Sequence, residues 1–119
     1  MDQKALLALL EERKFKELKE ELGNMYPVDI AELLEEVDER QMILIFRLLG
    51  KEEAAETFTD MSSETREFLI NALTDSELEE VMDEMYVDDT VDVLEEMPAN
   101  VVDRLLMATD EETRVQINA

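Results

Sequence analysis

The fold is decided by residues 26–109, in which apolar residues recur with a period of twelve. Read in blocks of twelve, the stretch runs YPVDIAELLEEV (26–37), DERQMILIFRLL (38–49), GKEEAAETFTDM (50–61), SSETREFLINAL (62–73), TDSELEEVMDEM (74–85), YVDDTVDVLEEM (86–97) and PANVVDRLLMAT (98–109). Positions five, eight, nine and twelve of the blocks are apolar 24 times out of 28, about twice the number expected from a composition that is 45% hydrophobic. The exceptions are Thr57, Arg66, Thr90 and Thr109.

These four positions are spaced i, i+3, i+4 and i+7, which gathers them on one face of an α-helix. In a half-buried strand, apolar and polar residues would alternate instead. Each block therefore predicts an amphipathic helix of about ten residues, roughly 15 Å long. Helices this short are not stable alone and must stack. Two blocks make a helical hairpin of 24 residues, the repeat of an α-solenoid. We predict an all-α fold, a right-handed superhelical stack of about ten short helices.

Residues typical of helix ends lie at the block boundaries. Three pairs match the capping box, in which a short polar side chain and the residue three positions later each bond to the other's backbone amide: Asp38 with Gln41, Thr74 with Glu77, and Thr109 with Glu112. Pro27 and Pro98 suit a first helical turn, and Gly50 suits a left-handed turn at a junction.

The length and composition predict one acidic helical-repeat domain over residues 1–119, without a linker. Its predicted parts are a leading helix pair within residues 1–25, repeats over 26–109, and the start of a last helix over 110–119. The two leading helices run from about Asp2 to Glu12 and from Lys14 to Leu22, and Gly23 ends the second. Most methionines fall on the apolar stripe and are interpreted as core residues: Met42, Met61, Met82, Met85, Met97 and Met107.

The charge of the chain is the second informative feature, because 33 acidic against 11 basic residues give a net charge of −22. Such a charge repels nucleic acid and anionic lipid, and it favours cations or basic proteins as partners. The longest strongly apolar stretch, residues 42–46, is far too short to cross a membrane, so we expect the chain to be soluble. Glutamate is also a good helix former, so each acidic residue alone is better interpreted as part of a solvated surface.

Enzymatic chemistry has little support in the sequence. The chain has no His and no Cys, which removes the common nucleophile–base pairs and the usual zinc ligands. Paired carboxylates need a pocket that shifts their pKa before they act as acid and base, and short helices with outward carboxylates rarely form one. We therefore predict that the protein is not an enzyme.

Several strings of residues resemble a known family when taken in order. They are residues 26–37 (YPVDIAELLEEV), 46–49 (FRLL), 53–56 (EAAE), 88–89 (DD) and 94–98 (LEEMP). Together they resemble the amino-terminal cytosolic domain of MgtE-type magnesium transporters. In that family the acidic helical domain precedes a pair of CBS domains and a transmembrane magnesium channel. The chain ends near the point where this resemblance would place the CBS pair.

The resemblance implies a metal role for three residues, Glu56, Asp88 and Asp92. The periodicity places all three away from the apolar stripe. Asp88 and Asp92 are spaced i, i+4 on one helical face, a spacing suited to a hard cation held by one or two carboxylates and water. Asp89 and Glu95 lie close by and are alternatives, and Glu56 belongs to a different block, so the three need not share one ion.

The resemblance also implies a mechanism and partners. Weakly bound, regulatory Mg²⁺ would bridge this acidic domain to the adjacent CBS domains and hold the channel closed. The partners would be the CBS and transmembrane domains of the same polypeptide, in a homodimer at the cytoplasmic face of the cell membrane, with no nucleic acid and no insertion of this segment into the membrane. An alternative keeps the solenoid without the ion: the stacked helices also resemble the flagellar motor switch protein FliG, a scaffold for protein–protein interaction.

Overall fold

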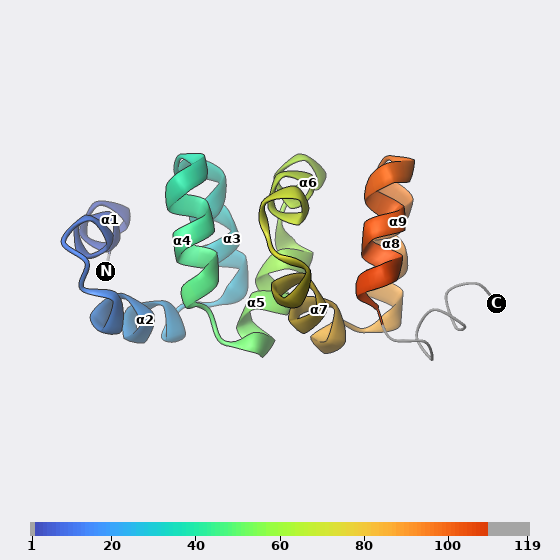
Figure 1. Ribbon diagram of the computed structural model, residues 1–119. Helices are drawn as coiled ribbons and strands as arrows, with labels where there is room; N and C mark the ends of the chain where they lie inside the picture. Colours follow the sequence, from blue (N-terminus) through green and yellow to red (C-terminus); the bar gives the residue numbers. More distant parts are fainter. Residues whose placement is uncertain (1, 110–119) are drawn as a thin grey trace. The chain divides into compact units, whose positions relative to one another are not determined.

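The computed structural model describes residues 2–109, and these residues form nine helices and no strand (Figure 1). The helices are α1 (Gln3–Glu11), α2 (Phe15–Gly23), α3 (Pro27–Glu36), α4 (Glu39–Leu48), α5 (Lys51–Asp60), α6 (Ser63–Ala72), α7 (Asp75–Glu84), α8 (Val87–Glu96) and α9 (Ala99–Ala108). The predicted all-α class and the predicted short helices are confirmed. The last helix that we predicted over 110–119 lies outside the described residues.

The core is built from the periodic apolar stripe. Of the 28 stripe positions, 23 are buried and five are partly buried, and none is exposed. Leu34, Phe58 and Ile70, all at position nine, are completely buried. The twelve-residue spacing therefore identifies the buried face of every helix from α3 to α9.

All four polar exceptions to the stripe are buried as well. Thr90 and Thr109 satisfy their hydroxyls locally by donating to the carbonyl oxygens of Tyr86, at 3.2 Å, and of Leu106, at 2.8 Å. Thr57 is different, because its hydroxyl is fully buried in α5 and has no hydrogen-bond partner among residues 2–109. The helical register thus holds these side chains in the core even where their chemistry does not suit it.

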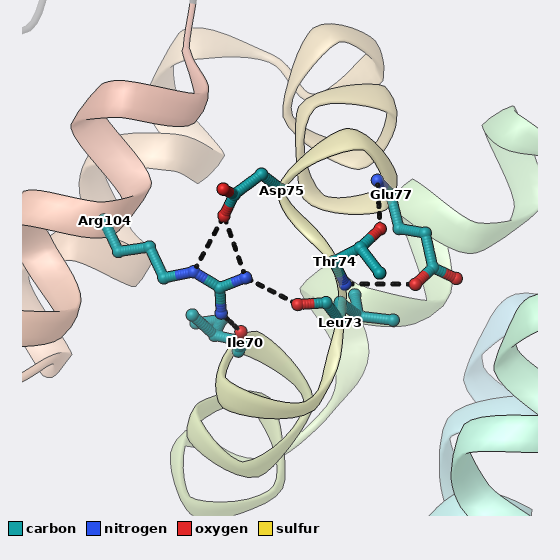
Figure 2. Close-up of polar contacts among 6 residues, drawn as sticks. All are labelled: Ile70, Leu73, Thr74, Asp75, Glu77 and Arg104. Atoms are coloured by element: carbon teal, nitrogen blue, oxygen red, sulfur yellow. Dashed lines mark hydrogen bonds and ion pairs between the residues drawn. The ribbon is translucent and has the colours of Figure 1, made fainter.

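Two of the predicted capping boxes are present. In α4, Asp38 accepts from the amide of Gln41 at 2.8 Å and donates its own amide to the Gln41 side chain at 3.2 Å. Thr74 and Glu77 form the same reciprocal pair at the start of α7 (Figure 2). The third predicted box needs Glu112, which lies outside the described residues. Pro27 occupies the first turn of α3, as predicted.

The predicted left-handed turn at Gly50 is wrong. Gly50 has an extended backbone, with φ −67° and ψ 161°, and serves as the N-cap of α5. Arg13 has the left-handed conformation instead, with φ 59°. Its amide donates to Leu10 O at 3.0 Å and the amide of Lys14 donates to Leu9 O at 2.9 Å, the pair of bonds that defines a Schellman C-cap. The reversal between α1 and α2 requires a positive φ whether or not a glycine is available.

The described residues divide into two compact units, residues 2–61 with α1–α5 and residues 62–109 with α6–α9. In the first unit α3 packs chiefly on α5, the second helix along, and also on α4, while α1 packs on α2. The rings of Phe46 and Phe58 meet edge to face in this unit, with centroids 6.5 Å apart. Stacking of every second helix is the arrangement expected of a two-helix repeat. Whether residues 1–119 form a single domain stays a prediction.

The second unit is centred on α9, which packs on α7 and α6. Arg104 of α9 reaches the end of α6, where its guanidinium donates to the carbonyl oxygens of Ile70 and Leu73, and it also contacts Asp75 in the first turn of α7 (Figure 2). The buried Arg66 of α6 forms an ion pair with Glu96 at the end of α8. Each of these arginines joins elements about 30 residues apart in the sequence.

The methionines follow the predicted core assignment with one exception. Met42, Met61, Met82 and Met97 are buried and Met85 is partly buried. Met107, however, is 78% exposed, because it occupies position ten of its block rather than a stripe position. The interpretation of Met107 as a core residue is therefore wrong.

Candidate metal site

Helix α8 carries two of the three residues that we predicted to contact metal. Asp88 lies in its first turn and Asp92 lies one turn later, and both side chains are exposed. Thr90 and Val93 on the same helix are buried, so the apolar stripe fixes the direction in which the two aspartates point. The spacing of i, i+4 brings Asp88 and Asp92 onto neighbouring positions of one helical face. The prediction that Asp88 and Asp92 lie on one face of the helix, away from the apolar stripe, is confirmed.

The two alternative residues differ in exposure. Glu95 is exposed and continues the face of Asp88 and Asp92 at i+7, whereas Asp89 is only partly exposed. A hard cation such as Mg²⁺ takes carboxylate oxygens and retains several waters, so exposed carboxylates suit it. On this face, Glu95 is therefore a better placed alternative than Asp89.

The charge around α8 is almost entirely negative. Residues 75–96, which span α7 and α8, include eleven acidic residues and no basic one. The basic residues of the second unit within the described range are Arg66 and Arg104, and both make the internal contacts described above. Neither Asp88 nor Asp92 forms an ion pair with any residue between 2 and 109. Asp88, in the first turn, interacts favourably with the amide dipoles at the start of α8, whereas Asp92 lies beyond that turn.

Glu56, the third predicted residue, lies on α5 in the first unit and is also exposed. It influences Glu53, one turn earlier on the same helix. Partial burial raises the pKa of Glu53 above its ordinary value, the negative charge of Glu56 raises it further, and the positive charge of Lys19 on α2 lowers it. Glu53 was not among the predicted site residues, although its i, i+3 spacing from Glu56 indicates that the two carboxylates share a helical face.

The structure thus brings Asp88 and Asp92 onto one helix and places Glu56 in the other compact unit. Within the described part of the chain, no group of three or more acidic residues is arranged to hold a metal ion. The assignment of metal to Glu56, Asp88 and Asp92 stays a prediction. No helix among residues 2–109 combines the length and the apolar character needed to cross a bilayer.

The fold and its surface define an acidic, all-α helical-stack domain. More particularly, the chain belongs to the family of the MgtE intracellular N domain, whose model matches residues 25–119. This family membership confirms the predicted resemblance and agrees with the prediction that the domain is not an enzyme. No curated protein gives a significant sequence match.

A solved structure supports the same assignment. The chain is similar to the cytosolic domain of the Mg²⁺ channel MgtE, in a crystal structure of its complex with ATP, with 28% sequence identity and a TM-score of 0.87. The match covers 99% of this chain and 49% of the other, so the chain spans about half the length of the protein that it resembles. The resemblance inferred from the residue strings is confirmed.

Proposed function

We propose that this chain is the magnesium-sensing regulatory domain of a magnesium channel. Mg²⁺ ions bridge its exposed carboxylates, above all Asp88 and Asp92, to acidic groups on the adjacent CBS domains of the same polypeptide. Glu56, on the first unit, is proposed to contact Mg²⁺ as well, and it need not share an ion with Asp88 and Asp92. The observation that carries the proposal is the pair of exposed aspartates one turn apart on α8, which form no ion pair with the described residues.

The electrostatics give the proposed switch its direction. At low Mg²⁺, a domain with a net charge of −22 is repelled by an acidic neighbour, so the separated arrangement is favoured. At high Mg²⁺, ions between the two surfaces replace repulsion with shared coordination, and the domains close into the non-conducting state. The ion shifts this equilibrium only by its difference in affinity for the two arrangements.

Two features of the relatives support the proposal. The matched structure is the cytosolic domain of a Mg²⁺ channel, and the matched chain is about twice as long as this one. A partner domain of the same polypeptide is therefore available in that relative to supply further ligands. The proposed location is the cytoplasmic face of a membrane, in a homodimeric channel.

The test is calorimetric titration of Mg²⁺ into this chain, alone and together with the CBS segment of its own polypeptide. We expect weak binding to the chain alone and clearly tighter binding when the CBS segment is present, because bridging needs both surfaces. Equal affinity in the two titrations would refute bridging.

Matched variants identify the residues responsible. The double variant Asp88→Asn/Asp92→Asn should abolish the Mg²⁺-dependent gain in affinity for the CBS segment. Glu79→Gln/Asp83→Asn, which removes two exposed carboxylates at the same i, i+4 spacing from α7, should leave that gain nearly unchanged and serves as the charge control. If the control variant lost as much as the α8 variant, general screening of charge would explain the effect and the α8 assignment would be wrong.

A further inference from the structure

The two tyrosines of the chain occupy the same position, the N-cap of a helix, and both are exposed. Tyr26 is the N-cap of α3 and Tyr86 is the N-cap of α8, and neither makes a side-chain capping bond. Both side chains are almost fully in solvent, at 76% and 80% exposure. Of the other seven N-cap residues in the described range, Asp2, Asp38, Ser62 and Thr74 cap their helices with a side-chain bond, whereas Lys14, Gly50 and Pro98 do not.

The folding of the domain does not account for a tyrosine at these positions. An N-cap residue without a side-chain acceptor leaves a helical amide without the bond that Ser, Thr, Asp or Asn would give. An exposed aromatic ring also gains nothing from burial within the chain. Tyrosine therefore contributes less to folding here than a serine would, and its exposed ring is available for contact with a partner.

The backbone of Tyr86 is nevertheless held firmly. Its carbonyl oxygen accepts from the amide of Thr90 at 3.0 Å and from the Thr90 hydroxyl at 3.2 Å, and Thr90 is buried. An exposed aromatic ring on a fixed backbone loses little conformational freedom when it is covered, a property of residues that dominate interfaces. The ring projects from the end of α8 where Asp88 lies.

We infer that Tyr86 is a direct contact residue of the surface through which α8 docks on the neighbouring CBS domain. This inference rests on the proposed function, which assigns that neighbour to the aspartates of α8. Tyrosine suits such an acidic interface because its ring packs without adding charge between two negatively charged surfaces, and its hydroxyl donates to a carboxylate. Mg²⁺ supplies the electrostatic part of docking, and Tyr86 supplies apolar contact that needs no ion.

The test compares Tyr86→Ser with the unmodified chain in binding to the CBS segment of the same polypeptide at saturating Mg²⁺. Serine supplies the missing cap, so the variant chain should melt a few degrees higher than the original. Its affinity for the CBS segment should nevertheless fall about tenfold or more. Because folding and docking change in opposite directions, a loss of binding cannot arise from unfolding. An affinity within twofold of the original would overturn the inference.

Two further variants make the result specific. Tyr86→Phe should retain most of the affinity because the ring makes the contact, and a loss equal to that of Tyr86→Ser would overturn this role. Tyr26→Ser makes the same cap substitution at α3 and should raise the melting temperature without changing docking. An equal loss of docking there would overturn the assignment to the α8 surface.

The failure of this inference can be separated from failure of the proposed function. The proposed function fails if docking of the unmodified chain does not depend on Mg²⁺, or if Asp88→Asn/Asp92→Asn leaves that dependence intact. The inference about Tyr86 fails if docking depends on Mg²⁺ as proposed but Tyr86→Ser binds as well as the original. The aspartate variants change the response to Mg²⁺, whereas Tyr86→Ser lowers affinity at every Mg²⁺ concentration.

Discussion

Replacing Arg104 by methionine should lower the free energy of unfolding of the second unit. The guanidinium donates to the carbonyl oxygens of Ile70 and Leu73, the latter at 2.5 Å, at the end of α6 (Figure 2). These carbonyls lie where a helix has no further amides to satisfy them, and a cation there also interacts favourably with the helix dipole. Arg104 is thus the C-terminal cap of α6, provided by α9.

The magnitude follows from these contacts. Hydrogen bonds from a charged donor contribute about 1.5–3 kcal/mol each. The Arg104 side chain is 28% exposed, so water partly replaces the lost bonds, and we expect a loss of about 2–4 kcal/mol for the two bonds together. The contact with Asp75 adds little, since that carboxylate is 88% exposed and exposed ion pairs contribute roughly 0–1 kcal/mol.

The assay is urea unfolding followed by circular dichroism at neutral pH. Arg104→Met keeps a long apolar side chain and removes only the donors, Arg104→Lys should recover part of the loss, and Asp75→Asn removes the exposed partner alone. We expect Arg104→Met to destabilise the chain most, Arg104→Lys to destabilise it less, and Asp75→Asn to destabilise it least. If Arg104→Met cost less than about 0.5 kcal/mol, or if Asp75→Asn cost as much as Arg104→Met, the capping role of the guanidinium would be refuted.

Four other substitutions test single features of the fold. Arg13→Gly should stabilise the chain by about 1 kcal/mol in the same urea assay, because glycine adopts a φ of 59° without a clash between Cβ and the following carbonyl oxygen. A loss of stability would contradict the Schellman cap. Thr57→Val should stabilise it by about 1 kcal/mol, since it removes a buried hydroxyl that lacks a partner among residues 2–109, and a loss of stability would indicate a bond to that hydroxyl. The folded chain holds protons on Glu53 more tightly than the unfolded chain, so this group lowers stability as pH rises past the ordinary glutamate value of 4.5. Glu53→Gln should therefore raise the melting temperature at pH 7 and not at pH 3. Glu56→Gln should lower the pKa of Glu53 in an NMR titration. An unchanged pKa in that titration would show that the two carboxylates do not interact.

Much of the fold was predictable because helix packing follows a period that the residues display directly. The polar residues at stripe positions are the instructive cases. Arg66 and Thr90 looked like breaks in the pattern, yet both are buried, since the rigid helix places a residue by its angle and not by its polarity. The register of the repeat was a better guide to burial than the chemistry of each side chain.

The features that escaped prediction depend on contacts distant in sequence or on backbone geometry. The pairing of Arg66 with Glu96 spans 30 residues and requires the stacking of helices that no local pattern encodes. The positive φ of Arg13 arises because the chain must reverse after α1, although the nearest glycine is Gly23 at the end of α2. Sequence spacing alone also could not indicate that Glu53 would be partly buried beside Glu56.

The candidate site was predictable to the same extent as the helices that carry it. The spacing of Asp88 and Asp92 identified a common exposed face, and the structure has both side chains in solvent. The metal role itself came from the resemblance to a family and stays a prediction, because the described residues contain no group of three or more acidic side chains arranged to hold a metal ion. Tyr86 was missed because helix periodicity describes positions within a helix and not the cap before it.

The stacking of every second helix has a consequence for how each unit forms. When α3 meets α5, or α7 meets α9, the chain closes a loop of only about two helices, so little entropy is lost before contacts are gained. Proteins with such low contact order fold on the microsecond to millisecond scale. Assembly within each unit can then begin at any adjacent pair and extend outward, and damage to one pair is felt first by its immediate neighbours.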